Sequence, residues 1–125
     1  MTARGAEKAL EAGASGIVVS NHGGRVLDHC PATAEVLPEI VDAVGGKLTI
    51  FVDGAIRSGM DMFKALALGA DAVLIGRPFV TTVYGGGEEG VQLYVQKLKA
   101  ELADTMRMCG AHSLAEIKRS MLFGF

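Results

Sequence analysis

The chain has 125 residues, a length that accommodates one compact domain with its own core but not two. Half of the residues are hydrophobic, 21% are charged and the formal net charge is -2, values that are ordinary for a soluble globular protein. The 12 lysines and arginines are scattered and offset by 14 acidic residues, so the composition argues against a nucleic-acid or anionic-membrane partner.

The two cysteines, Cys30 and Cys109, form no closely spaced pair, and no basic-then-apolar leader precedes them. We therefore expect no disulfide framework and no metal site, and we expect reduced thiols in a cytoplasmic protein. The most apolar stretch, 65–75, is interrupted by Gly69 and Asp71 and is shorter than the roughly 20 residues that a membrane span needs. No membrane segment is predicted.

The first predicted helix covers residues 2–12, where Ala6, Ala9 and Leu10 have helical spacing, and it ends at Gly13. The apolar run 16–19 follows without alternation. Such a run is typical of a strand that is buried on both faces, as in a parallel sheet.

The same order of helix and strand occurs twice more. Apolar spacing predicts a helix over 36–44, in which Pro38 removes one backbone hydrogen bond from the first turn, and then a strand over 48–52. Ser58 and Asp61 form a capping-box pattern at the start of a helix that ends at Gly69. The strand 72–75 comes next.

Segments 13–19 and 69–75 resemble each other, which indicates a repeated helix-turn-strand unit. Three strands alternating with helices favour an α/β fold with a parallel sheet. Beyond them, the glycines 85–87 predict a hinge. A long helix follows with an apolar stripe between Val91 and Cys109, and a last short helix begins at Ser113.

Ligands of parallel α/β folds bind at the carboxyl ends of the strands. The first strand ends in Ser20-Asn21-His22-Gly23-Gly24-Arg25. The glycines let the backbone approach a ligand, His22 can act as a general base because histidine titrates near neutral pH, and Arg25 can clamp a carboxylate. The alternative is an ordinary turn with a solvated arginine and a hydrogen-bonded histidine.

The second strand runs into residues 53–59, directly before the capped helix. Backbone N–H groups at the start of that helix, with Arg57 beside them, predict a phosphate cradle. The alternative is a βα turn in which the Asp53 side chain accepts from backbone amides. The third strand ends in Gly76-Arg77-Pro78, which brings a second cation to the neighbouring strand end. Together these two loops match the phosphate site that barrels build after strands seven and eight.

Four motifs in order, SNHGGRVLD, DGAIRSG, FKALALGAD and IGRP, resemble the C-terminal signature of the FMN-dependent 2-hydroxy-acid dehydrogenases and oxidases, such as glycolate oxidase, lactate oxidase and mandelate dehydrogenase. The resemblance covers the chain from about residue 6 to residue 122. It implies that residues 1–125 form the C-terminal part of such a domain, with strands six to eight of a (β/α)₈ TIM barrel followed by C-terminal helices.

The resemblance also implies a role for each matching residue. His22 matches the catalytic histidine, which takes a proton from either the carbon or the hydroxyl group of the substrate, and Arg25 matches the arginine that binds the substrate carboxylate. Ser20 matches a residue near the flavin ring. The other residues that the resemblance implies as cofactor-binding match the contacts to the ribityl chain and the phosphate of FMN: Asp53, Gly54, Ala55, Arg57, Gly76 and Arg77.

Two positions depart from the family pattern DGG-x-RRG, since Ala55 replaces a glycine and Ser58 an arginine. We expect the phosphate contacts to be weakened or rearranged. A full barrel needs about 250 residues, so the other strands and the family's lysine and tyrosines would lie before Met1. The isolated chain is then expected to be poorly active and to self-associate through unpaired strands, whereas the full-length enzyme would form the homo-oligomer typical of the family.

The expected partner is a small 2-hydroxy acid. Two other functions remain open. One is a non-catalytic module that binds FMN or another phosphorylated ligand through Arg57 and Arg77. The other is a different phosphate-binding barrel enzyme of the IMP dehydrogenase type, although neither Cys30 nor Cys109 lies in a loop that would suit such an enzyme.

Overall fold

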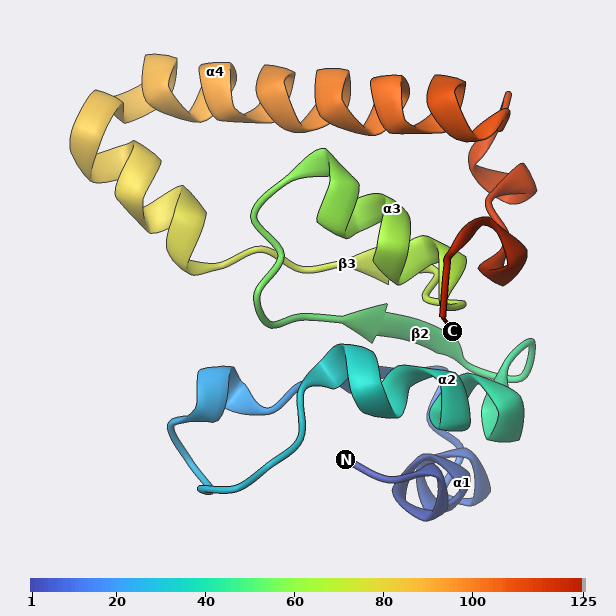
Figure 1. The fold of residues 1–125 in the computed structure, drawn as a ribbon. Helices are drawn as coiled ribbons and strands as arrows, with labels where there is room; N and C mark the ends of the chain where they lie inside the picture. The colour runs from blue at the N-terminus through green and yellow to red at the C-terminus, as the bar shows by residue number, and fades with distance from the viewer. Residues whose placement is uncertain (125) are drawn as a thin grey trace.

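The computed structural model describes residues 1–124 and confirms the predicted alternation of helices and strands (Figure 1). Its main elements, in chain order, are α1 (Ala3–Glu11), β1 (Gly16–Val19), α2 (Thr33–Val44), β2 (Thr49–Val52), α3 (Gly59–Ala67), β3 (Ala72–Val73) and α4 (Arg77–Cys109). Short 3₁₀ helices cover His22–Gly24, Leu114–Glu116 and Arg119–Met121. Helix α4 lies across α3, and α1 lies beside α2.

The three strands form one parallel sheet in the order β1-β2-β3, as predicted. Gly16 of β1 pairs with Thr49 of β2, and Val52 of β2 pairs with Val73 of β3. Because the strands are parallel and lie in chain order, their carboxyl ends meet at one edge of the sheet. The loops that follow them are therefore neighbours in space.

Strand β3 is shorter than predicted, since the strand over 72–75 is reduced to two residues. The Leu74 N–H still donates to the Val52 carbonyl oxygen at 2.9 Å, so the chain follows β2 beyond the assigned strand. At Gly76, with φ -104° and ψ -86°, the backbone leaves this direction and α4 begins.

The apolar runs are typical of strands buried on both faces, and residues 1–124 cover only one face of the sheet. Val19, Ile50 and Val52 are buried on the side of the sheet that faces the helices. On the strands' other side Val18 is 52% exposed and Leu74 is 42% exposed, because nothing in residues 1–124 packs over them. An apolar sheet face of this kind corresponds to the interior of a barrel, where side chains from all strands fill the centre.

Two clusters of apolar side chains form the core. The larger lies between the sheet and helices α1 and α2, where Leu37, Val44 and Ile50 are at most 1% exposed. The smaller surrounds Phe63 of α3, against which Leu102 and Met106 of α4 pack. Pro38 lies inside α2, which begins at Thr33, three residues earlier than predicted.

Helix α4 also begins earlier than the sequence predicts, because the chain is already helical from Arg77. The predicted hinge is a kink at Gly87, whose φ of 53° and ψ of -137° interrupt the helix. The apolar stripe is only partly buried: Leu98 lies in the interior, whereas Val95 is 47% exposed and Cys109 is also exposed. No helix in residues 1–124 is both long enough and apolar enough to cross a membrane.

Asp71 ties the turn before β3 to β2. Its Oδ2 accepts from the Ile50 N–H at 2.7 Å, and its own N–H donates to the Ile50 carbonyl oxygen at 2.8 Å. We expect Asp71→Ala to lower the free energy of unfolding by about 1–3 kcal/mol, because a backbone N–H of a central strand loses a charged acceptor. Urea unfolding measures this, with the exposed Asp28→Ala as control; equal losses in the two variants would contradict the assignment.

Candidate active site

A cavity of about 920 Å³ opens where the three strands end, a volume within the range of about 300–1,000 Å³ usual for ligand sites. The structure brings together at this cavity all nine residues that the sequence singles out: Ser20, His22, Arg25, Asp53, Gly54, Ala55, Arg57, Gly76 and Arg77. They come from three separate loops. Parallel pairing of the strands is what places these loops side by side.

The loop after β1 is a tight turn that exposes His22 to the cavity. The His22 N–H donates to Ser20 Oγ at 3.1 Å and the Gly23 N–H donates to Asn21 Oδ1 at 3.0 Å. His22 has a φ of 54°, a left-handed conformation that histidine adopts more readily than most residues. These backbone contacts are those of a turn, but no hydrogen bond holds the His22 ring within residues 1–124. The ring is thus free to meet a ligand.

Arg25 and Arg77 converge on the backbone of Gly23. A Cβ atom placed on Gly23 would lie 2.8 Å from Arg77 Nη2 and 3.8 Å from Arg25 Nε. The φ of 67° favours glycine at this position, and a Cβ atom would also displace the end of the Arg77 side chain. Neither arginine forms an ion pair in the described chain, and the same is true of Arg57. Three unpaired guanidinium groups at one cavity favour an anionic ligand.

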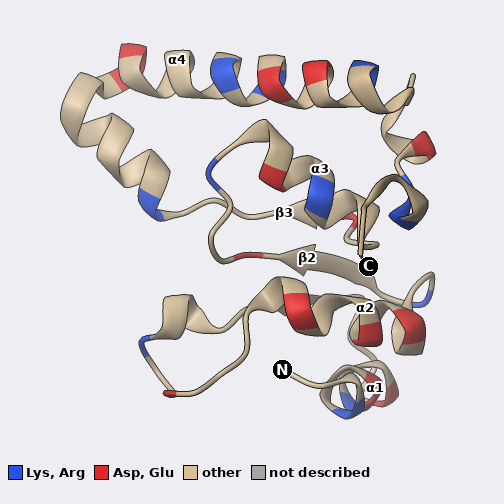
Figure 2. Cartoon of the chain, in the orientation of Figure 1, with Lys and Arg blue, Asp and Glu red and all other residues tan. Residues whose placement is uncertain are grey.

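Figure 2 shows basic residues on the loops at the end of the sheet where the strands terminate and the cavity opens. Within residues 1–124 no three side chains of the metal-ligating types are grouped so as to hold a metal ion.

Asp53 carries an unsatisfied polar atom into the site. Its backbone is fixed, because its N–H donates to the Val19 carbonyl oxygen at 3.1 Å and its own carbonyl oxygen accepts from Thr33 Oγ1 at 2.8 Å. Its Oδ1 is buried and has no hydrogen-bond partner in the described residues. The alternative in which this carboxylate bonds backbone amides is therefore not what the structure shows. A ligand hydroxyl group would satisfy the atom, whose burial unpaired costs about 1–3 kcal/mol.

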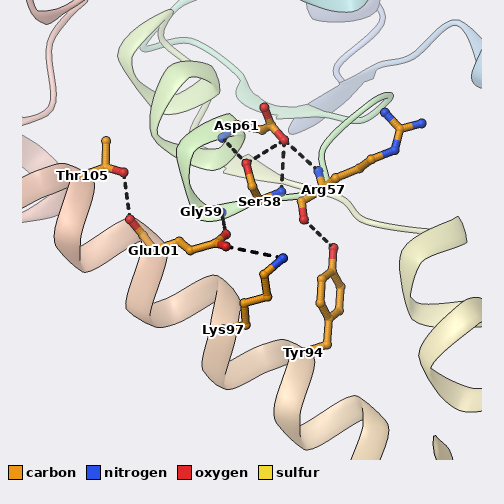
Figure 3. Close-up of polar contacts among 8 residues, drawn as sticks. All are labelled: Arg57, Ser58, Gly59, Asp61, Tyr94, Lys97, Glu101 and Thr105. Carbon is orange, nitrogen blue, oxygen red and sulfur yellow. Dashed lines mark hydrogen bonds and ion pairs between the residues drawn. The ribbon is translucent and has the colours of Figure 1, made fainter. Parts of the chain in front are cut away.

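At the start of α3, where the sequence predicts a phosphate cradle, acidic side chains already accept from backbone N–H groups (Figure 3). Asp61 Oδ2 accepts from the N–H groups of Arg57 and Ser58, both at 3.0 Å, and Glu101 Oε2 accepts from the Gly59 N–H at 2.8 Å. A phosphate group there would meet two carboxylates. Of the predicted cradle, the Arg57 side chain remains at the cavity.

The two departures from the family pattern have structural consequences. Ala55 adopts a φ of 61°, the region that favours glycine, so the turn is kept at a cost of about 1–2 kcal/mol. Ser58 is the N-cap of α3, where its Oγ accepts from the Asp61 N–H at 3.1 Å. The serine thus completes the predicted capping box at a position where the family more often has a second arginine.

Tyr94 and Thr33 belong to the surroundings of the site, and the sequence did not single out either of them. Tyr94 lines the cavity and donates from its hydroxyl to the Arg57 carbonyl oxygen at 3.0 Å (Figure 3). Asn21 Nδ2 donates to the Pro31 carbonyl oxygen at 3.4 Å, which braces the first loop. The apolar spacing on α4 indicated only a core position for Tyr94. Its hydroxyl group was the one feature in the sequence that could have indicated a polar contact.

The Asp61 network makes stability depend on pH. Burial raises the pKa of Asp61, but hydrogen bonds from Arg57 and Ser58 and the nearby Lys64 outweigh it, so the pKa lies below its ordinary value. A lowered pKa stabilises the fold fully above the unfolded value of about 3.9, and the contribution is lost as the pH falls through the folded value. We expect Asp61→Asn to flatten the dependence of unfolding free energy on pH between about pH 5 and 2. A slope equal to that of the unmodified chain would contradict this.

Comparison with known proteins identifies the family. A family model described as FMN-dependent dehydrogenase matches residues 1–123. The chain belongs to this family. A peroxisomal (S)-2-hydroxy-acid oxidase of Oryza sativa subsp. japonica is 49% identical over 120 residues, which cover 96% of this chain and 33% of that protein. An L-lactate oxidase of Roseobacter sp. (strain GAI101) is 48% identical over 120 residues, covering 96% and 32%.

A crystal structure of a mandelate oxidase with benzoyl-formic acid superposes with a TM-score of 0.92 at 46% identity, covering 95% of this chain and 36% of that one. The described fold is thus part of a TIM barrel of this family. The chain spans about a third of the length of these relatives.

The prediction of a cytoplasmic setting is overturned by the names of the relatives. Hydroxy-acid oxidases of Oryza sativa and of Arabidopsis thaliana that are 49–50% identical to the chain are peroxisomal proteins. The two free cysteines, Cys30 and Cys109, argue only against a disulfide framework. They do not distinguish one reducing compartment from another.

The residues at the cavity fit the cofactor that gives the family its name. The buried Asp53 Oδ1 suits a ribityl hydroxyl group, and the unpaired guanidinium groups of Arg57 and Arg77 suit a phosphate. A Cβ atom on Gly76 would meet nothing within 4 Å, so the backbone there is open to close approach. Each of these features lacks a partner within residues 1–124, and FMN carries the complementary group.

Proposed function

We propose that this chain is the C-terminal, FMN-binding part of an oxidoreductase that converts small L-2-hydroxy acids to 2-oxo acids. The observation that carries the proposal is the convergence of the three strand-end loops on one cavity with unpaired cations and an unpaired carboxylate oxygen. Family membership and the names of the relatives, which are 2-hydroxy-acid, lactate and mandelate oxidases, support the same conclusion.

Four residues of the second and third loops hold the cofactor. Arg57 and Arg77 bind its phosphate, the open backbone at Gly76 lies against it, and Asp53 accepts a hydrogen bond from a ribityl hydroxyl group. Bound FMN supplies the chemistry that side chains lack, because it accepts the two electrons that leave the substrate.

The first loop binds the substrate and moves the proton. Arg25 pairs with the substrate carboxylate, and its Nε is fixed by donating to the His22 carbonyl oxygen at 3.3 Å. This places the 2-hydroxy carbon close to His22 of the same turn. The His22 imidazole takes one proton, from either the carbon or the hydroxyl group, as the alcohol is oxidised to a carbonyl group. Ser20 holds the His22 N–H at 3.1 Å and so sets the turn.

A second candidate function is binding of FMN without turnover. It is favoured by the His22 ring, for which the described residues provide no acidic partner to orient it. The cofactor contacts from the second and third loops are independent of this histidine. Binding and catalysis can therefore be separated.

Anaerobic mixing with substrate distinguishes the two functions. The test uses the FMN-loaded full-length protein, because the isolated chain is expected to be poorly active. This protein is mixed with glycolate, L-lactate or L-mandelate, and loss of the visible absorbance of the flavin is followed, with D-lactate as the matched control. Oxidation of 2-hydroxy acids predicts bleaching by glycolate, L-lactate or L-mandelate and none by D-lactate. Bound flavin that none of these acids bleaches would reject the oxidase and support binding alone.

A further inference from the structure

Helix α4 holds the phosphate loop, residues 53–58, and the residue after it through two side chains that have no part in the chemistry proposed above. The Tyr94 hydroxyl donates to the Arg57 carbonyl oxygen at 3.0 Å, and Glu101 Oε2 accepts from the Gly59 N–H at 2.8 Å (Figure 3). Lys97 Nζ lies 3.4 Å from the other carboxylate oxygen of Glu101. The loop is therefore anchored to α4 as well as to α3.

The peptide group between Arg57 and Ser58 is held at both of its polar ends. Its carbonyl oxygen accepts from Tyr94, and its N–H donates to Asp61 Oδ2 at 3.0 Å. The Arg57 side chain has no ion pair or hydrogen bond of its own among the described residues, although it lines the cavity. Its position therefore depends on how this peptide group is oriented.

Tyr94 itself is well placed to act as a fixed donor. Its ring packs edge-on against Phe79 with centroids 5.1 Å apart and planes at 73°. These two residues lie on either side of the kink at Gly87, so the kink is what brings them together. Burial raises the pKa of the Tyr94 hydroxyl above its ordinary value, so the group remains a donor at neutral pH.

We propose that Tyr94 is a positioning residue for the cofactor phosphate. The identity of the ligand as FMN rests on the proposed function. The Tyr94 hydroxyl fixes the Arg57–Ser58 peptide group so that the Arg57 guanidinium meets the phosphate of FMN. The N–H groups at the start of α3 cannot take over this task, because Asp61 and Glu101 already occupy them. The affinity for the phosphate thus depends on a tyrosine that does not touch the phosphate.

Riboflavin, which lacks the phosphate, provides the discriminating probe. Tyr94→Phe keeps the ring and its packing on Phe79 but removes the donor. We expect the dissociation constant of FMN to rise about fivefold, the value of one neutral hydrogen bond, and that of riboflavin to change less than twofold. The matched control is Tyr84→Phe on the same helix, where the side chain is 90% exposed, and neither constant should change. Equal weakening of both flavins, or none, would overturn the proposal.

A second measurement without ligand separates this proposal from the proposed function. Amide hydrogen exchange at Arg57 and Ser58 is expected to be about fivefold faster in Tyr94→Phe than in the unmodified chain, and unchanged in Tyr84→Phe. If the unmodified chain binds neither flavin, the proposed function fails. The exchange rates still decide the role of Tyr94, because unchanged exchange would overturn it and faster exchange would support it.

Discussion

In the full-length protein, His22→Asn is expected to lower the rate of flavin reduction by L-2-hydroxy acids by about 10²–10⁴-fold, the usual contribution of a general base. The affinity for FMN should change little, because His22 is not among the cofactor-binding residues, most of which lie in the loops after β2 and β3. Asparagine tolerates the left-handed φ of 54° at this position, so the turn is kept while the base is lost. Rapid-mixing absorbance under anaerobic conditions measures the rate.

His29→Asn is the matched control for this experiment. His29 lies in the same stretch of chain, is exposed and has a φ of 60°, but it does not line the cavity. Its replacement should leave the rate within about twofold of the unmodified protein, because no reacting group is removed. Similar losses in the two variants, or none in His22→Asn, would show that His22 is not the base.

The double variant Arg57→Ala, Arg77→Ala lacks both proposed phosphate-binding arginines. It is expected to bind FMN about 10²-fold more weakly, or weaker still. Each charged hydrogen bond contributes about 1.5–3 kcal/mol, and every 1.4 kcal/mol is a factor of ten in the dissociation constant. Since the two side chains come from different loops, the single variants should each lose part of the affinity. Flavin fluorescence during titration measures the dissociation constants.

The control is a second double variant that loses the same two positive charges at positions away from the site. Arg4 on α1 and Arg107 on α4 are exposed, and neither lines the cavity. Replacing both with alanine should leave the FMN affinity within about twofold, because distant surface charges are screened by salt. If the two double variants weaken FMN equally, the effect would be one of net charge and the phosphate site would have to be placed elsewhere.

The sequence was sufficient to predict the order of elements and the residues that meet at the cavity. Both follow from local rules: apolar runs separated by helices make a parallel sheet, and the loops after parallel strands share one edge. The capping box of Ser58 and Asp61 is likewise a local signal, and the structure confirms it. All nine candidate site residues lie within six residues of a strand end, and the family resemblance added the expected roles of Ser20, Gly54 and Ala55.

What the sequence could not supply depends on contacts between distant segments. The glycines 85–87 indicate a hinge, but the sequence did not predict that the segment before it is also helical, from Arg77 onward. From the sequence alone, the N–H groups at the start of α3 are expected to be free to bind phosphate. In the structure the Gly59 N–H donates to the carboxylate of Glu101, 42 residues further along the chain. The role of Tyr94 has the same origin, since its partner Arg57 is 37 residues away along the chain.

The measurement that tests the account most directly is an NMR titration of the ¹⁵N-labelled chain with FMN. One FMN per chain should bind, and the largest amide shifts should fall on residues 20–25, 53–57 and 76–77, the three loops that line the cavity. Amides of α1, which lies away from these loops, should stay in place. An absence of binding, or shifts centred on other parts of the chain, would contradict the claim that the three strand-end loops form one FMN site.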